Sequence, residues 1–425
     1  MYKEEQLKSI FQGKRILLAG YGREGKSSER LIRSLLPEAD ITIVEGNDAI
    51  RQQAPLGYDL IVKSPGIPTF VFEGLCNLDT ITSQTDIFLQ VYGQQTIGVT
   101  GTKGKSTTTN LIAAIMREHT PHTLMAGNMG IPLFDIADQL DDQSVVVAEF
   151  SCHQLENIHR APHIGVLLNL FQEHLDHYHS YLDYQLAKLQ IGLRQVSGDA
   201  FYYCQDNPEL ASLVARYAPQ IASEVTPYGL DTELSRRLAL WERKLQGDHN
   251  LSNIVVACLV ALRMGVGEET VRSVVSRFTG LEHRMELVGT YDGVTYYNDS
   301  ISTIPQAAIA AIEALQKVDT LILGGFDRGI DYSVLARYLA HHPIPNLVFV
   351  GEAGLRIREA YHQELTPSAP VANELVENDY QTIVPWCKAH TAKGRICLLS
   401  PAAASYDAFR NFEHRGQLFK ELVRQ

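Results

Sequence analysis

The sequence lacks the features that would place the protein in a membrane or in an oxidising compartment. No run reaches the ~18 apolar residues that a membrane-spanning helix needs, and the opening residues, MYKEEQLKSIFQGKR, contain no apolar region of a signal peptide. The six cysteines are scattered without a C-x-x-C pair, which argues against a zinc ribbon and for reduced thiols. We therefore expect a cytoplasmic protein with no membrane insertion.

The chain also has fewer basic residues than acidic ones. The chain has 37 Lys and Arg residues against 49 Asp and Glu residues, a formal net charge of −12. This balance gives no support to nucleic-acid binding through a broad basic surface, although loops and helix N-termini can still hold small anionic ligands. We expect small-molecule partners, no nucleic acid and a monomeric protein.

The sequence does contain a regular alternation of short β-rich apolar runs with helical stretches, which is typical of parallel α/β sheets. A length of 425 residues suggests about three domains, and the predicted strands fall in three groups. They are RILLAG (15–20), ITIVEG (41–46) and LIVKSPG (60–66); TIGVTG (96–101), SVVVAEFS (144–151) and IGVLLNL (164–170); and TLILGG (320–325), NLVFVG (346–351) and RICLLSP (395–401). We predict an α/β fold of three domains: Rossmann-like over 1–93, a central P-loop ATPase-like parallel sheet over 94–280, and Rossmann-like over 281–425.

Residues 98–110, GVTGTKGKSTTTN, form a glycine-rich turn with an apolar strand before it and a helix after it. Gly104-Lys105-Ser106 matches the end of the phosphate loop G-x-x-x-x-G-K-[ST], but Val99 stands where its first glycine belongs. In a phosphate loop the backbone N–H groups would face a phosphate, Lys105 would reach the terminal phosphates, and Ser106 or Thr107 would bind Mg²⁺. The strand and helix on either side favour this interpretation over a chance glycine turn.

A second glycine-rich turn, GYGREG, follows the first predicted strand and fits the G-x-G-x-x-G dinucleotide fingerprint. Its glycines are Gly20, Gly22 and Gly25, and Glu45 at the end of the next strand could bond a ribose hydroxyl. A packing turn or another phosphate ligand is as frequent as NAD for such a motif, and Arg23 favours a phosphate. An NAD-dependent dehydrogenase would also leave the phosphate loop unexplained.

Glu149 ends the strand SVVVAEFS, beside the predicted phosphate loop. A carboxylate in this place is the usual second partner of the Mg²⁺, whereas a buried charge with neither partner nor metal would be costly. We therefore interpret Glu149 as a functional residue.

The segment 169–191 is dense in His and Asp, directly after another strand. Four of its side chains can be read as a transition-metal cluster: His174, Asp176, His177 and His179. No well-known zinc spacing appears among them, so zinc is the weaker interpretation. From the residues alone, Lys188 on the following helix reads as a solvated surface lysine, and Asn250 and Asn253 can simply cap the helix that they open.

Taken together, these stretches resemble the Mur ligases, ATP-dependent amide-forming enzymes of bacterial cell-wall synthesis. The family's loop reads G-T-x-G-K-[ST]-T, as Gly101–Thr107 does, and this accounts for the glycine that is out of place. Within the family the chain is most similar to the branch that adds glutamate to UDP-N-acetylmuramoyl-L-alanine. The similar blocks are GNMG (127–130), EFSCHQLE (149–156), EHLDHY (173–178), GDHN (247–250), LEHRME (281–286), NDS (298–300) and LLSPAAASYDAFRNFEHRG (398–416).

The resemblance implies that ATP and Mg²⁺ are bound, and that the substrate carboxylate is activated as an acyl phosphate. The residues that it implies at ATP are Gly101, Thr102, Lys103, Gly104, Lys105, Ser106, Thr107, Asn253, Arg284 and Asp299. The implied metal ligands are Ser106, Glu149, His174 and Lys188, the last as a carbamate. With Lys105, the last three are also the implied catalytic residues.

The resemblance also implies two substrate sites. The residues implied at the site for UDP-N-acetylmuramoyl-L-alanine are Gly20, Gly22, Gly25, Glu45, Asn128, Ser151 and Gln154. The residues implied at the site for glutamate are Thr303, Arg328, Ser405 and Phe412.

Several residues depart from the family's pattern. Lys103 stands where the family has Asn, Asp or His, and Cys152-His153 replaces Ser-Phe. Ile301 replaces a lysine near the amino-acid site, while Arg328 falls near the place of a carboxylate-binding lysine. These changes bear on the enantiomer. D-glutamate is the preferred prediction, L-glutamate is the alternative, and a nucleotide-binding protein without ligase activity on the same fold is a further one.

Overall fold

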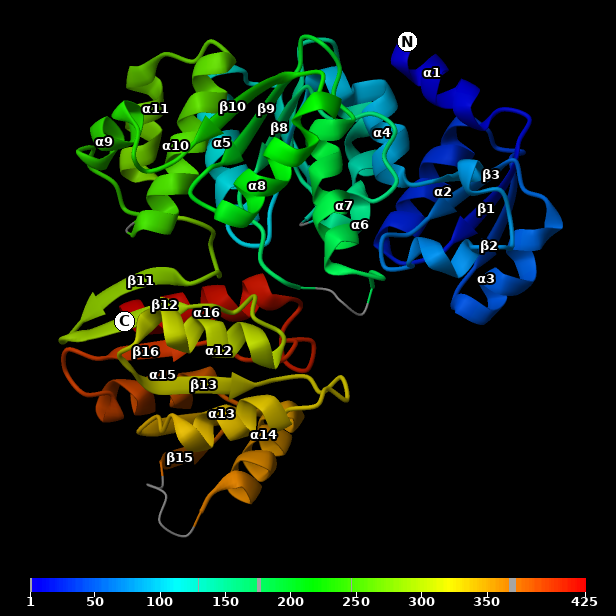
Figure 1. Cartoon of the computed structure of the whole chain (residues 1–425). Helices are drawn as coiled ribbons and strands as arrows, with labels where there is room; N and C mark the ends of the chain where they lie inside the picture. The colour runs from blue at the N-terminus through cyan, green and yellow to red at the C-terminus, as the bar shows by residue number, and fades with distance from the viewer. Residues whose placement is uncertain (1, 129, 174–176, 246, 367–371) are drawn as a thin grey trace. The chain divides into compact units, whose positions relative to one another are not determined.

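The computed structural model of the chain describes residues 2–128, 130–173, 177–245, 247–366 and 372–425. It divides into two compact units, Met1–Phe278 and Thr279–Gln425, and each is described by itself. Three separate sheets with helices around them are visible in Figure 1, so the predicted α/β class is confirmed. The domain boundaries near 93 and 281 stay predictions. No helix in the described ranges is long and apolar enough to cross a membrane.

The first unit begins with a four-stranded parallel sheet of order β2-β1-β3-β4. Its strands are β1 (Arg15–Ala19), β2 (Asp40–Val44), β3 (Leu60–Lys63) and β4 (Ile81–Thr82). Its helices are α1 (Tyr2–Phe11), α2 (Arg23–Leu35), α3 (Asn47–Gln53) and α4 (Gln84–Tyr92). The GYGREG turn is the connection from β1 to α2, as the sequence predicts.

A six-stranded parallel sheet of order β10-β9-β8-β5-β7-β6 forms the rest of the first unit. Its strands are β5 (Thr96–Thr100), β6 (Thr123–Gly127), β7 (Val145–Glu149), β8 (Ile164–Leu167), β9 (Ala200–Cys204) and β10 (Glu224–Tyr228). Its helices are α5 (Lys105–His119), α6 (Cys152–Leu155), α7 (Tyr181–Leu193), α8 (Pro208–Tyr217), α9 (Glu233–Ala239), α10 (Asp248–Arg263) and α11 (Glu268–Arg277). Because β5 lies between β7 and β8, the loops at the carboxyl ends of these strands meet.

The second unit holds a six-stranded mixed sheet of order β11-β12-β16-β13-β14-β15, in which only the β11–β12 pair is antiparallel. Its strands are β11 (Glu286–Tyr291), β12 (Val294–Asn298), β13 (Val318–Gly324), β14 (Asn346–Val350), β15 (Asn373–Val376) and β16 (Ile396–Leu399). Its helices are α12 (Pro305–Leu315), α13 (Ser333–His341), α14 (Gly351–Glu364), α15 (Tyr380–His390) and α16 (Phe412–Arg424).

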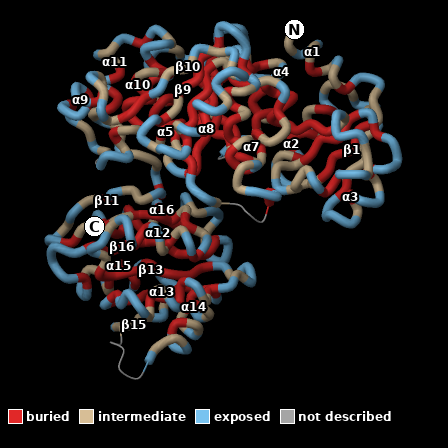
Figure 2. The backbone as a smooth tube through the Cα atoms, viewed as in Figure 1, coloured by how far each residue is buried: buried red, intermediate tan, exposed pale blue. Residues whose placement is uncertain are grey.

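The central strands are buried on both faces, which is why they read as continuous apolar runs. In β13, Leu321 and Leu323 belong to one hydrophobic cluster while Ile322, which points to the opposite face, belongs to another. Figure 2 shows the same burial along the strands of each sheet. Helices on both faces therefore leave the strand ends as the places where polar side chains can gather.

Candidate functional site

The phosphate loop joins β5 to α5, and close packing accounts for the position of its glycines. Gly101 has φ 153°, and a Cβ there would lie 2.9 Å from the Cβ of Leu168, at the end of β8. Gly104 has φ 84°, and a Cβ there would lie 2.9 Å from Oδ1 of Asn253. Gly104, the N-cap residue, makes no side-chain hydrogen bond to α5, and the N-terminus of a helix is a site where anions bind.

Asn169 holds the turn in shape. Its Oδ1 accepts hydrogen bonds from the backbone N–H groups of Thr102 and Lys103 at 3.1 and 2.8 Å, and its Nδ2 donates to the Lys103 carbonyl at 3.0 Å. The Thr102 hydroxyl is bonded to the Tyr184 hydroxyl at 2.8 Å. The sequence predicts no role for Asn169, although its place at the tip of a predicted strand is a signal.

Two lysines converge on one carbonyl of this loop. Lys105 Nζ donates to the carbonyls of Gly101 and Thr102 at 3.0 Å, and Lys188 Nζ, from α7, donates to the Gly101 carbonyl at 2.9 Å. Lys188 is only 2% exposed, so its interpretation as a solvated surface lysine is wrong. Burial, assisted by the neighbouring Lys105 charge, lowers the pKa of Lys188 to about 8.

Glu149 lies at the carboxyl end of β7 and is 2% exposed. Its Oε1 accepts a hydrogen bond from Asn128 Nδ2 at 2.8 Å, whereas its buried Oε2 has no hydrogen-bond partner among the described residues. A buried carboxylate oxygen without a partner is costly unless a cation binds it. Together with the buried Ser106 hydroxyl in the first turn of α5, this arrangement fits Mg²⁺, which takes few protein ligands and shares substrate phosphates.

The histidine-rich segment gives less support to a transition metal. His174 and Asp176 lie outside the described residues. His177 stacks on His153 with ring centroids 3.9 Å apart, and His179 packs on Phe70 at 5.0 Å. In the described part of the chain, no three His, Cys, Asp or Glu side chains are grouped as a metal site.

A cavity of about 450 Å³ adjoins the phosphate loop. It is lined by Lys103, Gly104, Leu168, Asn169, Phe171, Cys204, Asp206, Asn207, His249, Ser252 and Asn253. Asn253 is 7% exposed, and the N-cap residue of its helix α10 is Gly247. Neither residue is therefore the N-cap of α10, and the capping interpretation of Asn253, which lies inside the helix, is wrong. Lys103, also at this cavity, forms an ion pair with Glu173 at 2.8 Å.

Short polar contacts join the GYGREG turn to the helix after β7. Ser151 and Gln154 form a capping box at the start of α6, and Gln154 Nε2 donates to Glu24 Oε1 at 2.7 Å. Burial raises the pKa of Glu24. Gly20 and Gly22 lie in the turn between β1 and α2, Gly25 lies in the first turn of α2, and Glu45 is exposed directly after β2. The sequence does not predict the contact to Glu24, because the two residues are 130 positions apart.

In the second unit, Asp299 is buried at the end of β12. Its carboxylate accepts hydrogen bonds from the Met285 N–H at 3.1 Å, the Ser302 hydroxyl at 2.5 Å and the Ser400 hydroxyl at 2.7 Å. Burial raises the pKa of Asp299 despite these bonds. Arg284 and Asp299 belong to the second unit, so their contact with the nucleotide stays a prediction.

Arg415 of α16 holds together the loops that carry the predicted glutamate-site residues. It is 1% exposed, and its guanidinium donates to the Ser300 hydroxyl and to the Ser300 and Ala403 carbonyls at 2.8–3.1 Å. A further bond reaches the Ala404 carbonyl at 3.2 Å. Three of the predicted glutamate-site residues lie on or beside these loops: Thr303, Ser405 and Phe412. The Phe412 carbonyl accepts a hydrogen bond from the Ser300 hydroxyl at 2.8 Å. The fourth, Arg328, lies on the loop after β13. The sequence predicts no role for Arg415.

Comparisons with known proteins agree on one family. Residues 99–261 match the Mur ligase middle domain. The chain is 30% identical to the UDP-N-acetylmuramoylalanine–D-glutamate ligase of Desulfitobacterium hafniense, over 97% of this chain and 98% of that protein. It is 34% identical to the ligase of the same name from Symbiobacterium thermophilum, over 86% and 84%. The fold of MurF ligase from Thermotoga maritima in complex with ADP is similar at a TM-score of 0.54 and 14% identity, over 98% and 96%. This likeness confirms the predicted three-domain α/β arrangement.

Proposed function

Because the chain belongs to the Mur ligase family, we propose that it is the ATP-dependent ligase that joins D-glutamate to UDP-N-acetylmuramoyl-L-alanine. The observation that carries this proposal is the buried Glu149 oxygen, which has no hydrogen-bond partner among the residues that the structure describes, beside a phosphate loop on which Lys105 and Lys188 converge. The names of relatives at 30% and 34% identity support the choice of substrates.

The loop and the cavity beside it suit ATP. The first N–H groups of α5 and the Lys105 ammonium would hold its phosphates, and the 450 Å³ cavity with the buried Asn253 would take the rest of the nucleotide. The ADP-bound MurF structure supports this proposal as a fold-level likeness.

The reaction that follows needs two displacements. The carboxylate of the substrate's alanine attacks the γ-phosphorus of ATP; the bond to the ADP oxygen breaks and an acyl phosphate forms. The amine of glutamate then attacks the acyl carbon, phosphate leaves, the amine loses a proton and the amide remains. Lys105, whose ammonium group lies on the phosphate loop, would offset negative charge in both steps.

Ser106, Glu149, His174 and a carbamylated Lys188 would hold Mg²⁺, which when bound offsets the charge of the phosphates. The Asn128 amide orients Glu149 by holding one of its oxygens. Lys188 suits carbamylation because a buried amine with a pKa of about 8 is partly neutral near neutral pH. Its neutral amine would add to CO₂ and release one proton, and the product carboxylate replaces a cation by an oxygen ligand.

Two substitutions keep L-glutamate as the alternative substrate. Ile301 stands where the family has a lysine, so the predicted amino-acid site has one cation fewer. Arg328 stands near the place of another lysine and has a forked guanidinium instead of a point charge. We further propose that the protein acts in the cytoplasm as a monomer, which light scattering of the purified protein checks.

The test is release of ADP and phosphate by the purified protein. Release should require ATP, Mg²⁺, UDP-N-acetylmuramoyl-L-alanine and glutamate together, and mass spectrometry should detect the glutamate-extended nucleotide. A protein that binds ATP but releases no phosphate with any amino acid would instead be a nucleotide-binding protein on the same fold.

A further inference from the structure

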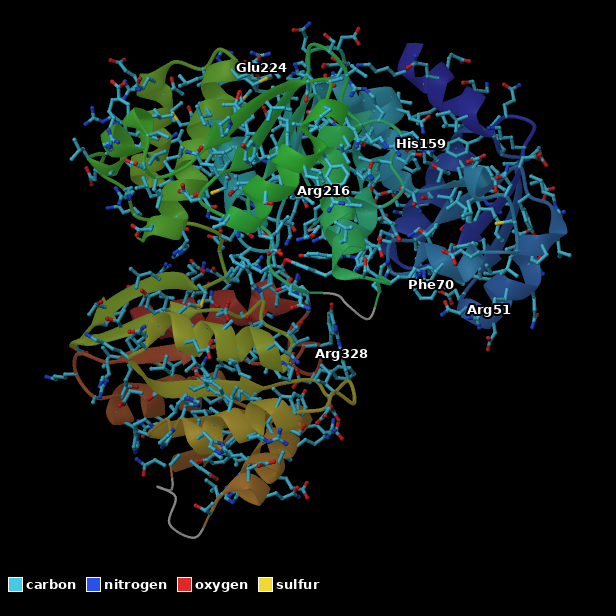
Figure 3. All side chains as sticks on the ribbon, in the orientation of Figure 1. Arg51, Phe70, His159, Arg216, Glu224 and Arg328 are labelled. Atoms are coloured by element: carbon cyan, nitrogen blue, oxygen red, sulfur yellow. The ribbon has the colours of Figure 1, made fainter. Side chains whose placement is uncertain are left out.

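The loop that follows β13 carries an acidic and a basic residue side by side, Asp327 and Arg328. Arg328 is exposed, lies over the Tyr406 ring at 5.6 Å and has no ion pair within the described residues. Figure 3 shows Arg328 labelled on this loop. The inference below rests on the proposed function, in which Arg328 binds a carboxylate of the amino acid.

Asp327 is the neighbouring group most able to interfere with that role. Its carboxylate directly precedes Arg328 in the chain, so an unengaged Asp327 would compete for the guanidinium and repel an anionic substrate. With Asp327, Arg328 and Asp331, the formal charge of this loop is −1.

Arg356, on helix α14, occupies this carboxylate. Its Nη1 lies 2.6 Å from Asp327 Oδ1, and the same oxygen accepts a hydrogen bond from the Gly329 N–H at 3.0 Å. The guanidinium also lies over the Tyr332 ring at 5.5 Å. Through Asp327, these contacts hold the turn around Arg328 against helix α14. The loop also carries Asp331, so the added charge of Arg356 brings the formal charge of the group from −1 to zero.

We propose that Arg356 is a positioning residue for amino-acid capture. It engages Asp327, fixes the turn around Arg328, and so leaves the Arg328 guanidinium available to the incoming carboxylate. The amino acid carries two carboxylates and one ammonium group, so a loop whose negative charge is offset by Arg356 repels it less than the same loop without Arg356.

The chain supplies a matched control two residues along the same helix. Arg358 forms an ion pair with Glu374 at 2.6 Å, and the exposed fractions of the two pairs are nearly equal: 42% and 12% for Arg358 and Glu374, against 41% and 16% for Arg356 and Asp327. Glu374 belongs to β15, away from the Arg328 loop. Arg358→Met therefore removes an arginine and an ion pair from the same helix while it leaves the Arg356–Asp327 ion pair intact.

The experiment compares steady-state kinetics of Arg356→Met and Arg358→Met. In Arg356→Met the KM for glutamate should rise about fivefold, on the scale of a partly exposed ion pair, with unchanged KM for ATP and for UDP-N-acetylmuramoyl-L-alanine. Arg358→Met should change all three by less than about twofold. Equal rises in the KM for glutamate in both variants would overturn the proposal, because the effect would then follow from α14 in general.

The charge argument has its own readout. Arg356→Lys should retain part of the affinity for glutamate that Arg356→Met loses. In an Asp327→Asn background, Arg356→Met should raise the KM for glutamate much less, because no carboxylate is then left to compete for Arg328. An undiminished effect in that background would contradict the proposal. Failure of the proposed function looks different, since the unmodified protein would then turn over neither glutamate enantiomer.

Discussion

Lys188 and Glu149 beside the phosphate loop of the first unit differ in burial from Arg328 on the amino-acid loops of the second unit. Lys188 and Glu149 are each 2% exposed, whereas Arg328 is exposed and the Tyr406 beneath it is 60% exposed. Buried charges must each be hydrogen-bonded or paired, so a change of residue there disturbs the whole network. Exposed charges tolerate replacement, so substrate choice can change on these loops while the energy-supplying chemistry stays the same.

The residues follow this difference. The loop Gly101–Thr107 has the family's G-T-x-G-K-[ST]-T pattern, and its one unusual residue, Lys103, is exposed and paired with Glu173. At the amino-acid loops, Ile301 and Arg328 both depart from the family's lysines. In the described part of the chain, however, the buried Arg415 is hydrogen-bonded to backbone carbonyls and a hydroxyl. A buried network of hydrogen bonds therefore lies beneath the exposed Arg328.

Removal of the Lys105 side chain should lower turnover more than any other substitution. A smaller loss than at the amino-acid loops would contradict the contrast between the two regions. Lys105→Ala should lower kcat by at least about a hundredfold, since preorganised cations at transferring phosphates are worth that much or more. Phosphate release measures the loss, and a thermal melt of the variant shows that it remains folded. A kcat close to that of the unmodified protein would remove the loop from the chemistry.

Lys188→Ala should come next, because it removes the proposed carbamate but not the phosphate loop. We expect kcat to fall about tenfold to a hundredfold, on the scale of a lost metal-ligand partner, and to recover partly with added formate or acetate. Lys105→Ala should show no such recovery. Full activity of Lys188→Ala would refute the carbamate role.

The carbamate should also depend on pH in a defined direction. Burial lowers the pKa of Lys188 from 10.5 to about 8, so the neutral amine that reacts with CO₂ increases as pH rises through about 8. In that window the folded chain loses a proton that the unfolded chain keeps up to about pH 10.5, so this group also adds stability as pH rises. ¹³C NMR with labelled bicarbonate should show a carbamate signal that grows from pH 6.5 to 8.5; a flat profile would contradict the account.

Arg328→Ala should have a smaller and more selective effect. The KM for glutamate should rise about tenfold, as expected when one charge-assisted contact to a carboxylate is lost. The KM for ATP should not change, and Arg328→Lys should retain part of the affinity. Parallel increases in the KM for glutamate and the KM for ATP would show that this loop serves both substrates. That result would contradict the assignment of the loop to amino-acid binding.

The sequence predicts much of the fold, and the parts that it misses have physical reasons. All nine predicted strands are present. Most of them are central parallel strands, which are continuous apolar runs, and the edge strand β2 has alternating isoleucines that also favour a strand. The prediction misses edge or near-edge strands such as β10 and β15. These strands carry polar residues, and β10 includes Pro227, which an edge position tolerates.

The same holds for the candidate site. The phosphate-loop motif and a strand end point to Lys105 and Glu149, and the resemblance to a family adds Lys188. Only the structure reveals that Lys188 is buried against the Gly101 carbonyl. The contact of Glu24 with Gln154 and the clamp around Arg415 join segments that are more than a hundred positions apart. Periodicity and spacing carry no information about such contacts.

The most direct test of the central claim is the specificity constant for the two glutamate enantiomers. Phosphate release would be measured at saturating ATP, Mg²⁺ and UDP-N-acetylmuramoyl-L-alanine with D- or L-glutamate in turn. The account predicts a kcat/KM for D-glutamate at least about a hundredfold above that for L-glutamate, a difference of about 3 kcal/mol in transition-state binding. Turnover of L-glutamate but not D-glutamate would contradict it.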